Sequence, residues 1–257
     1  MKHLEAITYQ VIFPEKGLAD FVSHFWHSWW NTGVQGAINY HSTANTSTEL
    51  AFAFKPGKQP VFSTLQGHTA NYSCIATGGL SEMFGVSLRS HAIPYFFEAS
   101  AGELVNQLVE LGDILGPDAE IITHRLANCD SFGRRVEIMS QYLKRKFNPN
   151  RKTDVAVIHA IRNIKARKGQ VNIQTLAKES LLSQKQFERR FKDFSGFNPK
   201  LYSRISRFES AFPLYNDDTS LTNKALDLGY YDQAHFINDF RSMLGSTPGE
   251  YADAHGS

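Results

Sequence analysis

The feature that most constrains this chain is a repeat in its second half, in which the same residue types return 49 positions later. The repeated pairs are Phe187 and Phe236, Phe191 and Phe240, Gly196 and Gly245, Pro199 and Pro248, and Tyr202 and Tyr251. Agreement of all these pairs on one offset indicates two copies of one structural unit. The chain is therefore expected to build the same short element twice.

Each copy has the residue types of a short helix, a tight turn and a second helix. The two Phe residues are four positions apart, so they share one helix face. The Gly beyond them suits the left-handed position that ends a helix, and the Pro that follows suits the start of the next helix. Ser183 and Asp232 are N-cap residue types directly before the two Phe-bearing helices. The pattern predicts two helix-turn-helix units, whose second helices fit the major groove of DNA.

This half of the chain resembles the AraC/XylS family of transcription regulators. The segments that carry the resemblance are 176–177, 182–192, 196–199, 225–236, 240–241 and 245–251. The most specific of them is the run Gly-Tyr-Tyr-Asp-Gln-Ala-His-Phe that ends at Phe236. Over about 154–253 the resemblance implies two helix-turn-helix units joined by a long helix from Pro199 to Tyr215. It also implies a sequence-specific regulator that binds double-stranded DNA and works with RNA polymerase.

Two residues depart from the family pattern. Pro213 lies near the end of the expected joining helix, where a Pro removes a backbone donor and favours a kink or an early end. Asn238 stands where the family often has a basic residue in its second recognition helix. We therefore expect the second unit to bind DNA less tightly than the first.

The resemblance places DNA contacts on the first Phe-bearing helix at two kinds of position. The residues expected at base edges are Lys185, Glu188 and Arg189, and those expected at phosphates are Gln184, Gln186 and Lys192. Lys and Arg donate to guanine, and Glu accepts from cytosine. The alternative for this helix is an ordinary solvated face.

The second Phe-bearing helix offers fewer charged candidates. Gln233 and Asn238 carry amides of the kind that read adenine. Arg241 is its basic anchor, and His235 either reaches a phosphate or braces the turn. We therefore expect hydrogen bonds rather than charge to dominate here.

Charge is unevenly distributed along the chain, although the total is only +2. Residues 1–150 carry 11 Lys and Arg against 13 Asp and Glu, a net charge of −2. Residues 151–192 carry 11 against 3, a net of +8, whereas residues 193–257 carry 5 against 9, a net of −4. A local +8 is typical of a surface that binds a polyanion, although a solvated helix face gives the same count.

The first half has a mixed pattern. Alternating apolar residues at 48–54, 61–65 and 83–88 predict strands. From about residue 91 the pattern turns helical, with Pro94 suited to a first turn. Two further helical segments are expected. They are a stretch through Leu104, Leu108 and Leu111, and an amphipathic helix from Arg135 to Phe147.

A polar segment at 147–154 separates the two patterns. We predict an α+β N-terminal domain, a small β-sheet or barrel plus helices, over residues 1–150. An all-α double helix-turn-helix domain follows over residues 151–257, and its apolar pattern predicts that it folds and binds DNA alone. The first domain is expected to bind an effector or to form a homodimer through the apolar side of the helix at 135–147.

The first half resembles, more weakly, a sensor-like domain found on some members of the family. Segments 21–26, 49–54 and 84–89 carry this resemblance, which implies a small-molecule effector but no specific effector-binding residues. The aromatic residues around Trp26 fit either a core or an apolar ligand pocket. His24 and His27 suggest a metal, but the ligand spacing of metal-binding cupins is missing, so we expect no metal and no cofactor.

Catalytic motifs are missing from the sequence, and we expect a regulator rather than an enzyme. One alternative is a DNA-repair methyl acceptor, or another enzyme, fused to the DNA-binding domain and using Cys74 or Cys129. Another is a nucleoid-architectural protein. The sequence has neither a membrane-length apolar stretch nor a signal-peptide core after Met1, which predicts a cytoplasmic protein with no membrane contact.

Overall fold

The computed structural model describes residues 8–29, 37–78, 80–99, 101–151, 153–211 and 221–255. The chain forms two compact units. The N-terminal unit comprises Met1–Tyr40, Ser47–His68 and Ala76–Thr153, and the C-terminal unit comprises His41–Thr46, Thr69–Ile75 and Asp154–Ser257. In the ranges described, none of the helices is long and apolar enough to cross a membrane.

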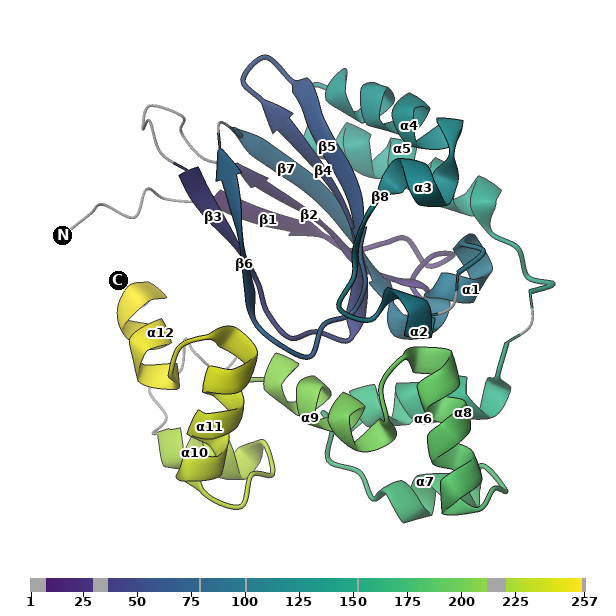
Figure 1. Ribbon diagram of the computed structural model, residues 1–257, viewed down its shortest axis with the longest axis vertical. Coiled ribbons are helices and arrows are strands. Elements are labelled where there is room, and N and C mark those ends of the chain that lie inside the picture. The colour runs from purple at the N-terminus through teal and green to yellow at the C-terminus, as the bar shows by residue number, and fades with distance from the viewer. Residues whose placement is uncertain are drawn as a thin grey trace. The chain divides into compact units, whose positions relative to one another are not determined.

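The N-terminal unit is built on a six-stranded antiparallel sheet with the order β1-β2-β7-β4-β5-β8 (Figure 1). The strands in that order are Thr8–Ile12, Val22–Trp29, Glu82–Arg89, Ser47–Lys55, Gln59–Gln66 and Leu108–Glu110. A second sheet pairs β3, Ala37–Ser42, with β6, Ser73–Gly78. The strands predicted at 48–54, 61–65 and 83–88 are confirmed as β4, β5 and β7.

Short helices pack on one face of the six-stranded sheet. They are the 3-10 turn Ser90–Ala92, α1 Ile93–Phe96, α2 Ala101–Leu104, α3 Leu111–Leu115, α4 Pro117–Ala127 and α5 Phe132–Lys146. Alternate residues of β4, Leu50, Phe52 and Phe54, are buried in one core with Leu126 of α4 and Met139 of α5. The period of two in the strand therefore decides which side chains meet the helices.

Two expectations for this unit are wrong. Leu104, Leu108 and Leu111 do not share a helix, because Leu108–Glu110 forms β8 and pairs antiparallel with the edge of β5. The apolar side of α5 is not free to pair with another copy, since Ile138, Met139 and their apolar neighbours on that side are buried in the core of the unit. Both errors have one cause: a local apolar pattern does not say which distant element will cover it.

In the described ranges 154–211 and 221–255, the regular elements of the C-terminal unit are all helices. Its helices are α6 Val155–Ala166, α7 Ile173–Glu179, α8 Gln184–Ser195, α9 Pro199–Glu209, α10 Leu221–Asp227, α11 Gln233–Leu244 and α12 Pro248–His255. In Figure 1 α9 lies between a group formed by α6, α7 and α8 and a group formed by α10, α11 and α12.

The joining helix α9 ends at Glu209, earlier than the expected Tyr215. At this end the backbone N–H of Ser210 is shared between the carbonyls of Ser206 (3.3 Å) and Arg207 (3.2 Å), and that of Ala211 bonds to Phe208 (2.9 Å), so the last turn tightens to bonds over three residues. Pro213 and Tyr215 lie outside the described residues.

Two segments from the first half of the sequence belong to the C-terminal unit. The backbone N–H of Ala44 donates to the carbonyl of Met243 (2.9 Å), and the backbone N–H of Thr46 donates to the carboxylate of Glu209 (2.9 Å). Gly245 lies so close to Tyr72 that an added Cβ would stand 2.9 Å from its ring. The expectation that the apolar pattern of 151–257 closes on itself therefore omitted these two segments. Assignment of functions to 1–150 and 151–257 stays a prediction.

A buried ion pair fastens α5 to the sheet in the N-terminal unit. Arg135 is 3% exposed and donates to both carboxylate oxygens of Glu82 on β7 (2.8 and 3.0 Å). It also donates to the carbonyl of Leu126 (3.0 Å), and the ring of His27 lies 2.9 Å from Glu82. Burial opposes the charge on Glu82, but the bonds from His27 and Arg135 lower its pKa to about 2. This stabilisation is present above the ordinary pKa of 4.5 and is lost as the pH falls toward 2.

Replacing Arg135 should therefore destabilise the N-terminal unit. We expect Arg135→Met to lower the free energy of unfolding by about 3 kcal/mol, because it leaves a largely buried carboxylate without its main partner. Arg134→Met is the matched control, since Arg134 is 61% exposed and pairs with Glu137 on the surface. Its cost should stay under about 0.5 kcal/mol in denaturant titrations. Equal losses in the two variants would show that the buried pair does not hold the unit together.

Candidate nucleic-acid interface

The sequence repeat is a structural repeat. α8, Gln184–Ser195, and α11, Gln233–Leu244, begin and end 49 positions apart. Gly196 and Gly245 end them with φ of 80° and 88°, in the left-handed region. The predicted helices, stops and restarts of both units are confirmed.

The start of α8 is fixed by a reciprocal cap. The Oγ of Ser183 accepts from the backbone N–H of Gln186 (3.3 Å), and the Gln186 amide oxygen accepts from the backbone N–H of Ser183 (3.1 Å). In α11 the carboxylate of Asp232 accepts from the backbone N–H of His235 (2.7 Å). Gln186, expected at a phosphate, is thus occupied in part by the cap.

The turns of the two units differ by one residue. Leu181 has a φ of 55° in the first turn, and Gly229 has a φ of 73° at the equivalent point of the second. From these points the N-caps follow after two residues in the first unit and three in the second, and Tyr231 is the extra residue. Tyr231 is 91% exposed beside the start of α11, so it is a surface residue that the sequence reasoning missed.

The outward face of α8 carries a basic stripe. Phe187 and Phe191 are fully buried. The stripe consists of Lys185, Arg189 and Lys192, which are all exposed. The spacings of four and three put them on one face of the helix, opposite the two Phe side chains. We call these three residues the basic stripe.

The other candidates on α8 lie beside this stripe. Gln184 is exposed and donates to the carboxylate of the half-buried Glu188 (2.8 Å). One oxygen of Glu188 is therefore engaged within the helix. The sequence places these two residues and the stripe on one helix, and the structure brings them together on one accessible surface.

A bidentate ion pair that the sequence reasoning missed positions α8. Arg190 donates from Nε and Nη2 to Asp154 (2.7 and 2.8 Å), and Asp154 also accepts from the backbone N–H of Val157 as the N-cap of α6. Although burial opposes it, the bonds from Arg190 keep the pKa of Asp154 below its ordinary value. An N-cap Asp before one predicted helix and an Arg on the side of a later helix are features of the sequence that could have indicated this pair.

The same face of α11 is almost uncharged. At the positions equivalent to the basic stripe it has Ala234, Asn238 and Arg241, all exposed. Gln233 is half-buried at the start of the helix. The exposed ring of His235 meets that of Tyr230 at 5.5 Å, which fits a brace for the turn.

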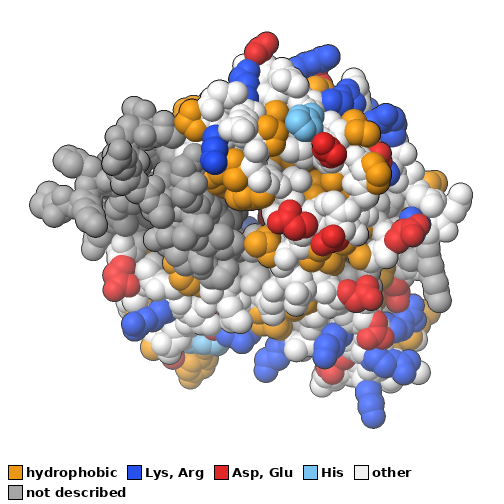
Figure 2. Space-filling view, turned by 45° about the horizontal axis from the view of Figure 1, so that its top comes forward, with side chains coloured by type: hydrophobic (Ala, Val, Ile, Leu, Met, Phe, Trp, Pro, Cys, Tyr) orange, Lys and Arg blue, Asp and Glu red, His pale blue; other side chains and the backbone are white. Residues whose placement is uncertain are grey.

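Two charges that the sequence count treats as free are paired. Asp239 is 4% exposed and accepts from Arg204 of α9 (2.6 Å), so it does not oppose Arg241 as a surface charge. Lys165, one of the cations counted in the net charge of +8 over residues 151–192, donates to Glu209. In the coloured part of the face in Figure 2, basic, acidic and hydrophobic side chains are interspersed. Because Asp239 and Lys165 are paired, the basic stripe is a better measure of the positive charge on α8 than the net charge of the region.

The His and Cys residues considered for a metal site or a methyl acceptor make other contacts in the structure. The ring of His24 bonds to Ser87 (3.2 Å) and that of His27 to Glu82. The described residues contain no group of three or more His, Cys, Asp or Glu side chains that could hold a metal. Cys129 is buried and donates to the carbonyl of Arg125, and the side chain of Cys74 lies outside the described residues.

Comparison with known proteins gives a match for each part of the chain. Residues 176–254, which span both copies of the repeat, match a family model described as "Helix-turn-helix domain". Residues 10–110 match one described as "Domain of unknown function (DUF6597)". The "Probable transcription factor PqrA" of Proteus vulgaris is 33% identical over 84 residues, which are 32% of this chain and 69% of that protein.

Two solved structures show the same local similarity. The DNA-binding domain of AdpA in complex with a target DNA is 25% identical, with a TM-score of 0.37, over 40% of this chain and 94% of that one. A probable AraC family transcriptional regulator from Rhodopseudomonas palustris is also 25% identical, with a TM-score of 0.37, over 39% of this chain and 97% of that one.

The strained backbone of Leu181, in the turn before α8, can be tested by substitution. Leu181 is 93% exposed and held at a left-handed φ, a conformation that favours Gly. We expect Leu181→Gly to raise the free energy of unfolding by about 0.5–1 kcal/mol. Leu226→Gly, at an exposed position inside α10, is the control and should lower it by about 1 kcal/mol. A loss in both variants would mean that the Leu181 side chain contributes contacts of its own.

Proposed function

Because this chain belongs to the AraC/XylS family and is a DNA-binding transcription regulator rather than an enzyme, we propose that α8 is its main DNA-reading element. The observation that carries the proposal is the basic stripe, Lys185, Arg189 and Lys192, opposite the buried Phe187 and Phe191. A helix held in this way can enter the major groove with its basic side chains toward the bases and its aromatic side chains in the core.

Within α8 the roles follow from reach and chemistry. Lys185 and Arg189 donate to guanine edges, and Lys192 neutralises a phosphate. Glu188 accepts from cytosine with the oxygen that Gln184 leaves free. The pair between Arg190 and Asp154 holds the helix while these contacts form.

The second unit makes a smaller contribution. Arg241 is the basic member of the triplet equivalent to the stripe, so α11 releases fewer counterions on binding than α8. Gln233 and Asn238 contribute hydrogen bonds to bases, and His235 supports the turn or a phosphate. This asymmetry supports a model in which the first unit provides most of the DNA affinity and the second unit adds a smaller contribution.

The N-terminal unit is the proposed receiver of a small-molecule effector. Its sheet and helices form a separate core, and the weak sequence resemblance of this half is to sensor-like domains. Contact with RNA polymerase, pairing with a second copy and a place in the cytoplasm belong to the same proposal. A purely architectural protein is the remaining alternative and would bind DNA without sequence preference.

Charge-neutralising variants test the unequal roles of the two units. Lys185→Gln with Arg189→Gln should weaken binding to duplex DNA strongly and reduce the slope of log affinity against log salt by up to about 2. Gln233→Ala with Asn238→Ala should weaken it less and leave the slope nearly unchanged. The measurement is a fluorescence-anisotropy titration across a salt series.

A variant that removes two positive charges elsewhere controls for net charge. Lys16 and Lys144 lie on the N-terminal unit, and Lys16→Gln with Lys144→Gln should change neither the affinity nor the slope appreciably. Equal losses of DNA affinity and equal slope changes for the α8 and α11 variants would instead indicate that the two units contribute equally to DNA binding.

A further inference from the structure

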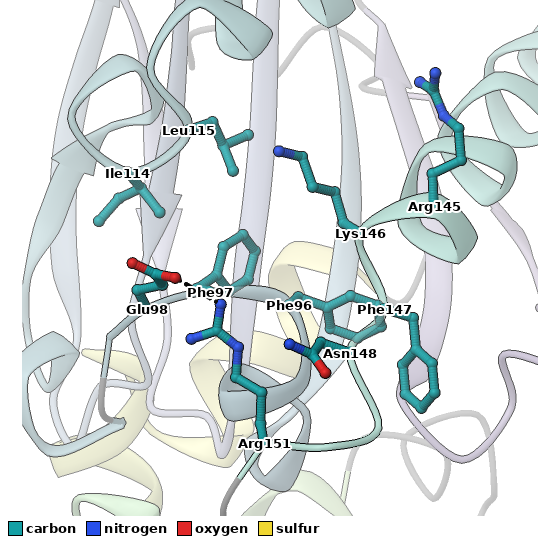
Figure 3. A pocket seen from close by; sticks show the side chains of 10 residues that line it. All are labelled: Phe96, Phe97, Glu98, Ile114, Leu115, Arg145, Lys146, Phe147, Asn148 and Arg151. Carbon is teal, nitrogen blue, oxygen red and sulfur yellow. Dashed lines mark hydrogen bonds and ion pairs between the residues drawn. The ribbon is translucent and has the colours of Figure 1, made fainter.

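The N-terminal unit contains a cavity where three of its helices end. Its volume is about 490 Å³, within the range of small-molecule sites. The ends of α1, α3 and α5 supply its walls, and the segment after α5 supplies its lower edge (Figure 3). This cavity is distinct from the surface proposed to bind DNA.

Five of the ten residues that line the cavity are apolar. The apolar residues are Phe96, Phe97, Ile114, Leu115 and Phe147. Phe96 and Phe97 are about 5% exposed or less, so they form a fixed floor. The ring of Phe147 stacks on that of Tyr95 (5.4 Å between ring centroids) and lies tilted against that of Phe96 (5.9 Å). The cavity thus offers rigid aromatic surface to the apolar body of a ligand.

Two cations stand over this apolar floor. Figure 3 shows Lys146 extending toward Leu115 and Arg151 rising beside Glu98, whereas Arg145 is directed away from the other side chains. Lys146 pairs with Asp118 (2.6 Å), and Arg151 pairs with Glu98 (2.9 Å).

The pair between Arg151 and Glu98 is open to exchange. Glu98 is 86% exposed, so this carboxylate can swing into solvent at little cost. The Nε of Arg151 is buried and has no hydrogen-bond partner among the described residues. A carboxylate that replaced Glu98 and accepted from both Nε and Nη2 would satisfy this donor with fork geometry.

The helix C-termini at the cavity reduce its preference for an anionic ligand but do not reverse that preference. Helix C-termini carry partial negative charge, and α1, α3 and α5 all end at the cavity. However, α1 and α3 have only four and five residues, so their dipoles are small. The last turn of α5 contains Lys144, Arg145 and Lys146, which offset the dipole of that helix. Once Glu98 has left Arg151, the full charge of that guanidinium outweighs the small partial charges at the ends of α1 and α3.

We propose that this cavity binds an organic anion with a compact apolar body, in particular a monocarboxylate. The apolar body lies on Phe96 and Phe97, and the carboxylate is held by Arg151 and Lys146. As the effector site of a transcription regulator, the assignment rests on the proposed function.

The position of Arg151 in the chain gives the ligand a route to α8. Arg151 is three residues before Asp154, which caps α6 and pairs with Arg190 of α8. A carboxylate that replaces Glu98 changes what holds Arg151, and with it the restraint on the segment that leads to this cap. Ligand binding is therefore expected to change DNA affinity.

The test compares two small molecules that differ in their charged group, phenylbutanoate and phenylbutanol. Calorimetric titration into the full chain should give saturable binding of the acid, with the alcohol at least about tenfold weaker. Lys146→Gln with Arg151→Gln should remove this difference, and Lys144→Gln on the same helix should not. Leu115→Glu, which places a carboxylate at the cavity wall, gives a second test and should weaken the acid more than the alcohol. Equal affinities for acid and alcohol, or an acid affinity that survives both sets of substitutions, would overturn the site.

A parallel titration separates the site from its regulatory role. DNA affinity measured with and without saturating phenylbutanoate should differ in the unmodified chain and not in the Lys146→Gln, Arg151→Gln variant. Binding of the acid in the cavity with unchanged DNA affinity would refute the effector role and leave the site. DNA binding that persists with no acid binding would refute the site and leave the DNA-reading role of α8.

Discussion

The packing of aromatic side chains on α9 is the constraint on which the proposed DNA-binding surface depends. Phe191 of α8 meets Tyr202 of α9, and Phe240 of α11 meets Phe208 of α9, each at 5.4 Å between ring centroids. One helix thus fixes the buried face of both α8 and α11. Because a helix has only one face opposite its buried one, these contacts also decide which residues α8 and α11 present outward. The remaining polar contacts refine an orientation that the aromatic core has already set.

The same scaffold carries two different outward faces. A repeat that keeps its aromatic core, caps and stops can change its exposed residues freely, because surface substitutions cost little stability. Here Arg189 of the first unit is replaced by Asn238 in the second, while the buried Phe side chains are kept. The pair between Arg204 and Asp239 further removes one charge of α11 from the surface. Structural similarity of the two units therefore does not imply equal affinity for DNA.

The repeat and the strands could be predicted because their signals are local. Phe spacing, N-cap residues and terminal Gly residues determined α8 and α11, and alternation determined β4, β5 and β7. Long-range pairing was not accessible in this way. The strand at Leu108, the covering of the apolar face of α5 and the contact of Ala44 with Met243 each depend on residues far away in the sequence. Counting charges failed for Asp239 because burial and a partner decide whether a charge reaches the surface.

The central claim, that the basic stripe of α8 reads DNA sequence, is tested most directly by Arg189→Ala on sequences selected by the unmodified chain. Affinity would be measured for the selected duplex and for every single-base change in it, at fixed salt. We predict a loss of about 1–3 kcal/mol on the selected duplex, with relaxed preference at one base pair and unchanged preference elsewhere. Equal weakening on all sequences would contradict the account, because it would make Arg189 a phosphate contact and leave sequence recognition to other residues.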